Sequence, residues 1–248
     1  MPSQVLQASE LSKSFGGLVA VDRVNLELNH AEVHAVIGPN GAGKTTLLSM
    51  LAGELSPTGG RIHLEQQDIT HSGSAARARL GIGRTFQRSA VIPGFSGLDM
   101  VRLATLNRGG LQLLQPLANN KAATALAQQA LARVDLTDRA NSVTDVLSHG
   151  EKRRLEIAAV LALDPKILLL DEPLAGLGPD ESRQVVTLIE DLRRDRAILL
   201  IEHDVDVVFA LADRITVLDN GRVIACGAPS DIRANTAARD AYLGLEPA

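Results

Sequence analysis

The fold of this chain is decided by residues 33–45, which read VHAVIGPNGAGKT. A short apolar run comes first, a glycine-rich turn follows, and residues 42–54 then have the leucine spacing of a helix. The turn matches the Walker A pattern GxxxxGK[ST], in which glycines let backbone N–H groups converge on phosphate oxygens. We therefore expect a phosphate-binding loop that consists of Gly38, Pro39, Asn40, Gly41, Ala42, Gly43, Lys44, Thr45 and Thr46.

Lys44 and Thr45 have separate expected roles in this loop. The lysine ammonium would bridge the β- and γ-phosphates of ATP, and the threonine hydroxyl would ligate Mg²⁺. The helix that begins here favours negative charge at its N-terminus. The alternative is a glycine turn that fits the pattern by coincidence, and the context of strand, turn and helix argues against it.

A second segment with chemical meaning is the apolar run 167–170, which ends in Asp171 and Glu172. Asp171, at the end of a strand, is placed to hold Mg²⁺ or its water, which is the Walker B role. Glu172, one residue further, would point elsewhere and could polarise the attacking water. The alternative is a pair of solvated acids in a loop, and it loses weight beside a Walker A loop.

The chain is long enough for one α/β domain. It has 248 residues, of which 45% are hydrophobic and 22% charged, as in an ordinary globular protein. The runs 167–170 and 197–201 are apolar without alternation and flank a helix near 180–194, which predicts strands of a buried parallel sheet. Residues 24–29 and 61–65 alternate, which predicts half-buried strands.

The remaining patterns complete the predicted architecture. Residues 215–218 and 223–226 form a hairpin pattern, and residues 119–134 are the clearest helix in an Ala/Leu/Gln-rich middle section. We predict a single P-loop NTPase domain with a RecA-like parallel sheet core, an antiparallel β subdomain and an inserted α-helical subdomain. The core would comprise about residues 1–87 and 161–248, and the helical subdomain about residues 88–160.

Composition excludes several other classes. The net charge is −4 and no dense Lys/Arg cluster occurs, so a general nucleic-acid-binding surface is not expected. No apolar run approaches the roughly 20 residues of a membrane-spanning helix, so at a membrane this chain would be a peripheral subunit. The single cysteine, Cys226, lies in an alternating apolar run and is expected to be an inert buried thiol in a reducing compartment.

Residues 147–158, shortly before the acidic pair, read LSHGEKRRLEIA. This segment resembles the signature motif of ABC-type ATPases, and three other positions match the same family in the right order. Gln87 in RTFQ resembles the Q-loop glutamine, and His203 in IEHD resembles the switch histidine. Phe15 in SKSFG resembles the aromatic residue that stacks on adenine, so the resemblance covers essentially the whole chain.

The resemblance implies a role for each matching position. Ser148, Gly150 and Glu151 would face the γ-phosphate of an ATP bound to an opposite copy, so that two chains sandwich two ATP molecules. His203 would contact the γ-phosphate and orient the catalytic carboxylate and its water. Gln87 would ligate Mg²⁺ or its water at the hinge to the helical subdomain.

The residues themselves leave plainer alternatives open. Ser148 with Glu151 three residues later is also an ordinary helix cap. A lone histidine at the end of a buried strand, as His203 would be, is often a structural hydrogen-bonding group. Gln87 could be a surface residue, and the arginines at 153–154 are expected on a solvated helix face rather than at a phosphate.

Four positions depart from the family pattern. His149 replaces the usual first glycine of the signature, and Glu151 replaces the usual glutamine. Gly178 stands where many relatives have the D-loop aspartate, so a contact across the dimer through that carboxylate is in doubt. Ala31 stands where a turn glycine is common, which weakens that turn slightly.

Three segments, 171–179, 201–205 and 241–244, resemble the ATP-binding subunits of branched-chain amino-acid importers and of related urea or short-amide importers. The lipopolysaccharide-export ATPase is also similar. The resemblance implies an importer motor at the cytoplasmic face of the membrane. Its cargo cannot be read from this chain, because the permease and the binding protein hold the cargo.

The same resemblance implies the partners. They would be a second copy or a homologous ATPase subunit, transmembrane permease subunits and, indirectly, a substrate-binding protein. The apolar segment 90–95, just after Gln87, is a candidate docking site for a permease helix, with ordinary core as an equal alternative. The rival classes are a soluble ABC ATPase, which usually needs tandem domains or long insertions, and a P-loop kinase, for which the signature would be a coincidence.

Overall fold

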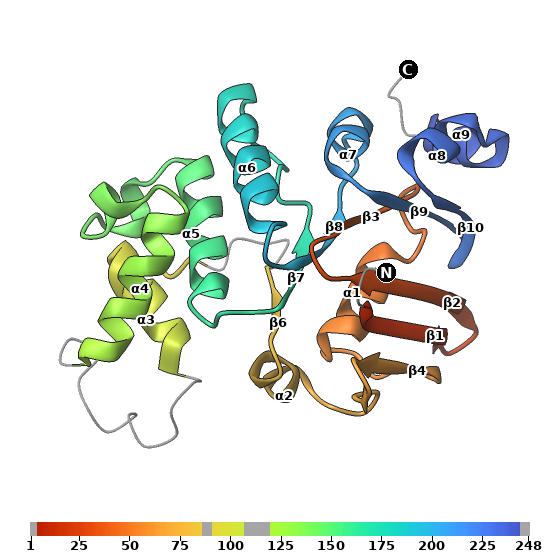
Figure 1. Cartoon of the computed structure of the whole chain (residues 1–248), viewed down its shortest axis with the longest axis horizontal. Helices are drawn as coiled ribbons and strands as arrows, with labels where there is room; N and C mark the ends of the chain where they lie inside the picture. The colour runs from red at the N-terminus through yellow and green to blue at the C-terminus, as the bar shows by residue number, and fades with distance from the viewer. Residues whose placement is uncertain (1–3, 86–90, 107–119, 244–248) are drawn as a thin grey trace.

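The computed structural model of the chain describes residues 4–85, 91–106 and 120–243. Figure 1 shows a central sheet with helices on both faces, an antiparallel sheet on one side and a group of helices on the other. This arrangement confirms the predicted fold class, a parallel P-loop core with an antiparallel β part and an inserted helical part. The division of the chain near residues 87 and 160 remains a prediction.

The central sheet has six strands. In spatial order they are β10 (Arg222–Gly227), β9 (Arg214–Asp219), β3 (Val33–Ile37), β8 (Ala197–Ile201), β7 (Ile167–Asp171) and β6 (Ile82–Arg84). Neighbouring strands pair in parallel, except that β9 and β10 form the predicted hairpin. Every residue of β3, β7 and β8 is buried, which explains why their sequences are continuous apolar runs.

The strand order brings the loops of the predicted site together. Both β3 and β7 pair with β8 in parallel, so the loops after these three strands begin at the same edge of the sheet. Ligands of open α/β sheets bind at this edge. The loop after β3 is the phosphate loop, the loop after β7 carries Glu172, and the loop after β8 carries His203.

Helices cover both faces of the central sheet. They are α1 (Lys44–Ala52) on one face, α6 (Pro179–Leu192) and α7 (Val205–Leu211) on the other, and α8 (Pro229–Ala234) and α9 (Thr236–Leu243) beside β9 and β10. Because side chains alternate along a strand, Leu169 packs in the same core as Leu48 of α1, whereas Leu168 packs with Ile189 of α6. Packing against the helices on both faces thus fixes the orientation of the strands and of the loops that follow them.

The antiparallel sheet has the spatial order β2 (Leu18–Asn29), β1 (Gln4–Phe15), β4 (Gly59–Leu64) and β5 (Gln67–Asp68). Its apolar face shares a core with α1. The short helix α2 (Ser74–Arg79) contributes Arg77, which is fully buried and donates to the carbonyls of Met50 at 2.7 Å and Leu51 at 2.8 Å. Arg77 therefore binds the C-terminal end of α1, where cations are favoured.

The helical part contains α3 (Gly97–Thr105), α4 (Lys121–Arg133), the short turns η4 (Thr137–Arg139) and η5 (Thr144–Val146), and α5 (His149–Leu161). The predicted helix at 119–134 is confirmed as α4, and it begins where the Asn120 side chain accepts a hydrogen bond from the N–H of Ala123 at 3.0 Å. In the parts of the chain that the structure describes, none of the helices combines the length and apolarity needed to cross a bilayer.

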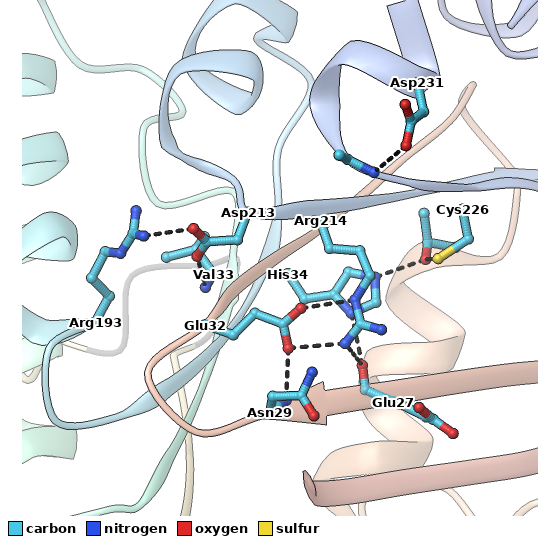
Figure 2. Close-up of polar contacts among 12 residues, drawn as sticks. Glu27, Asn29, Glu32, Val33, His34, Arg193, Asp213, Arg214, Cys226 and Asp231 are labelled. Carbon is cyan, nitrogen blue, oxygen red and sulfur yellow. Dashed lines mark hydrogen bonds and ion pairs between the residues drawn. The ribbon is translucent and has the colours of Figure 1, made fainter. Parts of the chain in front are cut away.

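A polar cluster anchors the start of β3 (Figure 2). Arg214 forms a two-pronged ion pair with Glu32, at 2.8 and 2.9 Å. Ala31, directly before Glu32, has a left-handed φ of +55°, which the glycine common at this position in relatives would adopt without strain. His34 is buried between the Glu27 carbonyl at 2.8 Å and the Thr216 hydroxyl at 2.7 Å. Burial lowers the pKa of His34 to about 4, so this histidine stays neutral.

Cys226 corrects one prediction. Its side chain is exposed rather than buried. Ala225, the residue before it on β10, is the one that faces the core, and side chains alternate along a strand. The alternation that suggested burial therefore places Cys226 on the outer face.

Candidate functional site

The phosphate loop connects β3 to α1 and depends on its glycines. Gly38, Gly41 and Gly43 have φ values of +148°, +82° and +100°, which glycine adopts without strain. A Cβ atom on Gly38 would lie 2.0 Å from the carbonyl oxygen of Leu218, and one on Gly43 would lie 2.4 Å from that of Ala20. Gly43 is the N-cap of α1 and has no side chain to bond the first N–H groups of the helix, so these groups can bind an anion.

Lys44 is folded over this loop. Its ammonium donates to the carbonyls of Gly38 at 2.6 Å and Pro39 at 3.0 Å. Burial lowers the pKa of Lys44, and the nearby charges of Glu172 and Asp171 oppose that shift. The Lys44 ammonium therefore lies near enough to both acids for their charges to act on it, and their joint binding of one ligand remains a prediction.

Asp171 ends β7 with its side chain fully buried. Its Oδ2 accepts a hydrogen bond from Arg84 at 3.0 Å, whereas Oδ1 has no partner among the described residues. Burial raises the pKa of Asp171, and the Arg84 guanidinium opposes the rise. A buried carboxylate oxygen left without a partner suits a Mg²⁺ ion or its water, so Asp171 fits the predicted metal role, and the role of Thr45 stays a prediction.

Arg84 is a member of this site that its sequence pattern did not indicate. It lies on β6, is largely buried, and also donates to Ser49 at 2.9 Å and Glu54 at 2.5 Å on and just after α1. It therefore ties the Asp171 carboxylate to the helix of the phosphate loop. Gln87, three residues later, lies outside the described residues.

Glu172 adopts an uncommon backbone conformation. Its φ is +47°, in the left-handed region, which costs a non-glycine residue about 1–3 kcal/mol and occurs often at functional sites. Its N–H donates to the Ile201 carbonyl at 2.9 Å. Asp171 is buried and Glu172 is partly accessible, which agrees with the expectation that the two acids point apart.

His203 follows β8, and its side chain is 59% exposed. Its N–H donates to Glu202 at 3.2 Å, and its Nδ1 lies 3.7 Å from the same carboxylate. Glu202 is buried, also accepts from the N–H of Leu174 at 2.8 Å, and has a pKa raised by burial. Glu202 thus joins the loop after β7 to the loop after β8, a contact that sequence reasoning missed.

The signature segment begins α5 as the predicted helix cap. The Ser148 hydroxyl accepts from the N–H of Glu151 at 3.1 Å, and the Glu151 carboxylate accepts from the N–H of Ser148 at 2.8 Å, which is a capping box. The Ser148 hydroxyl also donates to Glu181 Oε1 at 2.9 Å, and the Gly150 N–H donates to the same oxygen at 3.0 Å. These two bonds lower the pKa of Glu181.

Glu181 therefore stands in the structure where the resemblance predicts a phosphate. It belongs to the first turn of α6, which begins at Gly178, the position of the missing D-loop aspartate. A carboxylate held by one hydroxyl and one helix N–H group is direct geometric support for an anion site at Ser148 and Gly150. The carboxylate that occupies it comes from the same chain.

Phe15 lies at the end of β1 with its ring 48% exposed, beside the exposed side chains of Leu18 and Val19. The backbone of Ala20, directly after them, approaches Gly43 of the phosphate loop. An accessible apolar patch next to a phosphate loop suits a flat aromatic base. The Lys13 ammonium lies over the Phe15 ring, 5.2 Å from its centre.

The arginines of α5 correct a second prediction. Arg153 is buried, and the side chain of Arg154 is only 12% exposed, so neither lies on a solvated face. Both point toward carbonyl groups of neighbouring segments. The period of a helix identifies which residues share a face, but the packing partners of that face depend on the tertiary fold.

A RecA-like sheet with a Walker A loop, an acidic pair at the end of β7 and a capped helix α5 in the helical part together define a P-loop ATPase. Residues 21–175 match the family model described as ABC transporter, and residues 222–246 match the one described as branched-chain amino acid ATP-binding cassette transporter. The chain therefore belongs to the ABC transporter family, and it is an ATP hydrolase coupled to transmembrane transport.

Individual relatives agree with this assignment. The chain is 41% identical to the high-affinity branched-chain amino acid transport ATP-binding protein LivG of Escherichia coli K12, over 98% of this chain and 99% of LivG. It is 37% identical to the lipopolysaccharide export system ATP-binding protein LptB of Acidithiobacillus ferridurans, over 98% of each. A crystal structure of the ADP conformation of an ABC transporter ATP-binding cassette superposes with a TM-score of 0.89 at 27% identity, covering 97% of this chain and 99% of that one.

Proposed function

We propose that two copies of this chain, or this chain and a homologous ATPase subunit, close on two MgATP molecules and drive the import of branched-chain amino acids or related small polar solutes. The observation that carries the paired site is Glu181 on Ser148 and Gly150. It supports a second anion site on each chain, separate from the phosphate loop. In Figure 1, α5 lies among the helices of the helical part and α1 lies beneath the central sheet. We infer that the anion site of each chain serves the phosphate loop of a second chain.

Within one site, the chain's own residues divide the work. Lys44 and the N–H groups of the phosphate loop bind the β- and γ-phosphates. Thr45, Asp171 and Gln87 would hold Mg²⁺, which when bound neutralises charge on the phosphates. Glu172 orients and polarises the attacking water, and His203 contacts the γ-phosphate beside it. Ser148 and Gly150 of the other chain complete the site.

The proposal on cargo rests on relatives. LivG, at 41% identity, is a branched-chain amino acid transport protein by name, and the C-terminal residues 222–246 match a family model of the same description. The alternative, lipopolysaccharide export, is supported by the 37% identity to LptB. We propose import because both the whole chain and its C-terminal segment support it.

The proposed permease docking surface is apolar. Ile92 and Phe95 are 36% and 37% exposed, and Val143 and Val146 of a neighbouring loop are 44% and 70% exposed. The Thr144 hydroxyl donates to the Ile92 carbonyl at 2.8 Å, and the Thr144 N–H donates to that of Phe95 at 2.9 Å, so the two loops form one surface. Val91 packs partly against the core, whereas the exposure of Ile92 and Phe95 favours docking for the rest of this segment and supports a peripheral subunit held at the cytoplasmic face by permease subunits.

The test is transport by the assembled complex. The chain is co-purified with candidate permease subunits, placed in liposomes and supplied with a substrate-binding protein and labelled leucine. The proposal predicts leucine uptake that depends on ATP and stimulation of hydrolysis by the loaded binding protein. Lipopolysaccharide extraction without leucine uptake would instead support the export alternative. An ATP hydrolysis rate that is the same with and without the permease subunits would contradict a transport motor.

A further inference from the structure

Arg153 makes an unusual set of contacts between the signature helix and the loop after β7. Its Nε donates to the Pro173 carbonyl at 3.1 Å, and its Nη2 donates to the carbonyls of Asp171 at 3.1 Å and Glu172 at 2.5 Å. Its Nη1 pairs with Glu156, one turn further along α5, at 2.9 Å. Both charged side chains are buried, at 7% and 6% exposure.

These contacts meet the backbone where it is strained. Three consecutive carbonyls, from Asp171 to Pro173, turn toward one guanidinium, and the middle one belongs to Glu172 with its left-handed φ of +47°. The planar fork of arginine carries donors in fixed directions, so it can bind several carbonyls together. A lysine ammonium is a single point charge without that geometry. Arg153 thus favours the conformation in which the Glu172 side chain is presented.

The opposite side of this loop is held by β8 and its extension. The Ile201 carbonyl accepts the N–H of Glu172 at 2.9 Å, and Glu202 accepts the N–H of Leu174 at 2.8 Å. Beyond Leu174, the loop borders a cavity of about 400 Å³, which Arg153, Ala175 and Leu177 help to line. The bonds from Arg153 therefore tie the first part of the loop to α5, and Leu174 packs in the same core as Leu155 of that helix.

We propose that Arg153 is a positioning residue for Glu172, and that it transmits the position of the signature helix to the catalytic loop of the same chain. This inference rests on the proposed role of Glu172. Ser148 and Gly150 begin the helix that carries Arg153, about 7 Å further along its axis. A γ-phosphate that docks on this helix end would move Arg153 with it, so each ATP site would sense whether the other is filled.

The first test compares two adjacent arginines in the complete transporter. Arg153→Met removes the bonds to the catalytic loop, and Arg154→Met is the matched control because Arg154 donates to the carbonyls of Val134 at 3.1 Å and Asp135 at 3.2 Å, away from that loop. Arg153→Met is expected to lower kcat about 10- to 100-fold with KM for ATP nearly unchanged, since misplacing a reacting group by about 1 Å has effects of this size. Arg154→Met should keep kcat.

Loss of Arg153 removes the ion pair that Arg153 forms with the buried Glu156, so a second variant guards against misfolding. Arg153→Met combined with Glu156→Leu replaces the buried pair by apolar groups, an exchange that proteins often tolerate. It should fold, bind ATP and still have the low kcat. Arg153→Lys should recover only part of the activity. A folded double variant with the kcat of the unaltered protein would overturn the proposal.

A double-mutant cycle separates this proposal from the proposed function. In a Glu172→Gln background, adding Arg153→Met should leave the residual hydrolysis unchanged within about twofold, because the two changes act through one carboxylate. Independent, multiplicative losses would show that Arg153 does not act through Glu172. If the Glu172→Gln variant alone kept full hydrolysis, the proposed role of Glu172 would be wrong. The single variant shows this without any change at Arg153.

Discussion

Two helix N-termini in this molecule are proposed as anion sites, and their structures differ. At the start of α1, glycines in left-handed conformations shape the loop, and Lys44 adds a cation. At the start of α5, a capping box between Ser148 and Glu151 satisfies the first N–H groups, and Glu181 of the same chain already binds the Ser148 hydroxyl and the Gly150 N–H. The start of α1 has no side-chain cap, whereas the donors at the start of α5 are already hydrogen-bonded to a carboxylate of the same chain.

Under the proposed function, this difference would let the chain bind ATP alone and hydrolyse it only with a partner. The phosphate loop needs nothing from outside to present its donors. In the proposed mechanism, the signature end would exchange its bonds to Glu181 for bonds to a phosphate that a second chain delivers. A doubly or triply charged phosphate can compete with a single carboxylate at such a site.

The largest expected effect comes from Glu172→Gln. The change should lower kcat by about 10² to 10⁴-fold, because general-base catalysis contributes that much, and should leave ATP binding intact. It sharpens the comparison because ATP should then hold both helix ends together as a stable dimer, visible by light scattering. Glu190→Gln, on the exposed face of α6, is the control and should behave like the unaltered protein. Retained hydrolysis would remove Glu172 as the base.

Lys44→Ala should have the next largest effect, on binding. Hydrogen bonds to charged groups contribute about 1.5–3 kcal/mol, so ATP affinity should fall by roughly 10- to 100-fold. Titration of the isolated chain with a fluorescent ATP analogue measures it, with the exposed Lys166→Ala as control. Normal ATP binding by Lys44→Ala would break the comparison, because the open helix end would then not be the ATP site.

Ser148→Ala should separate the two helix ends. ATP affinity of the isolated chain should be unchanged, whereas hydrolysis by the complex should fall. The lost cap also destabilises the fold by about 0.5–2 kcal/mol, so Asn120→Ala, which removes the cap of α4, is the matched control for stability. If both variants lowered hydrolysis equally, Ser148 would be a structural cap and not part of an ATP site.

Glu181→Gln should have the smallest effect. Removing the charge weakens the internal bond to Ser148, so the KM for ATP of the complex should fall, by about two- to fivefold, since charged hydrogen bonds are roughly twice as strong as neutral ones. A raised KM would mean that Glu181 supports the closed site instead of competing with it.

The same contact predicts a pH dependence. Because the folded-state pKa of Glu181 is lowered, by Ser148 first and Gly150 second, its contribution to stability is present above the ordinary glutamate pKa and is lost as pH falls through the lowered value. The difference in Tm between the unaltered protein and Glu181→Gln should therefore shrink on acidification through that window. A constant difference would mean that the carboxylate is not held at this site.

Much of the fold was predictable because its signals are local. The Walker A turn, the unalternating runs that became β7 and β8, the hairpin of β9 and β10, and the helix α4 all carry their pattern within a few residues. The expected cap at Ser148 was visible for the same reason. The roles of the predicted site residues in binding and hydrolysis remain predictions.

Tertiary contacts were not predictable from the chain. Glu181 meets Ser148 across 33 residues, and Arg84 meets Asp171 across 87. Arg153 was expected on a solvated face because the helix period shows which residues share a face but not which segment packs against that face. In the structure, the loop after β7 packs there. Cys226 was expected in the core because its neighbours on β10 are apolar. Ala225 faces the core, so the side chain of the next residue, Cys226, faces outward.

The central claim, that the two helix ends of one chain serve two different ATP molecules, is tested most directly by crossed pairs of variants. Two complexes are purified through different tags on their two ATPase subunits, and their hydrolysis rates are compared. One pairs a Lys44→Ala chain with a Ser148→Ala chain, and the other pairs an unaltered chain with one that carries both changes. Shared sites leave one intact site in the first complex and none in the second, so the first should be the more active. Higher activity in the second complex would show that each chain completes its own site, and would contradict the account.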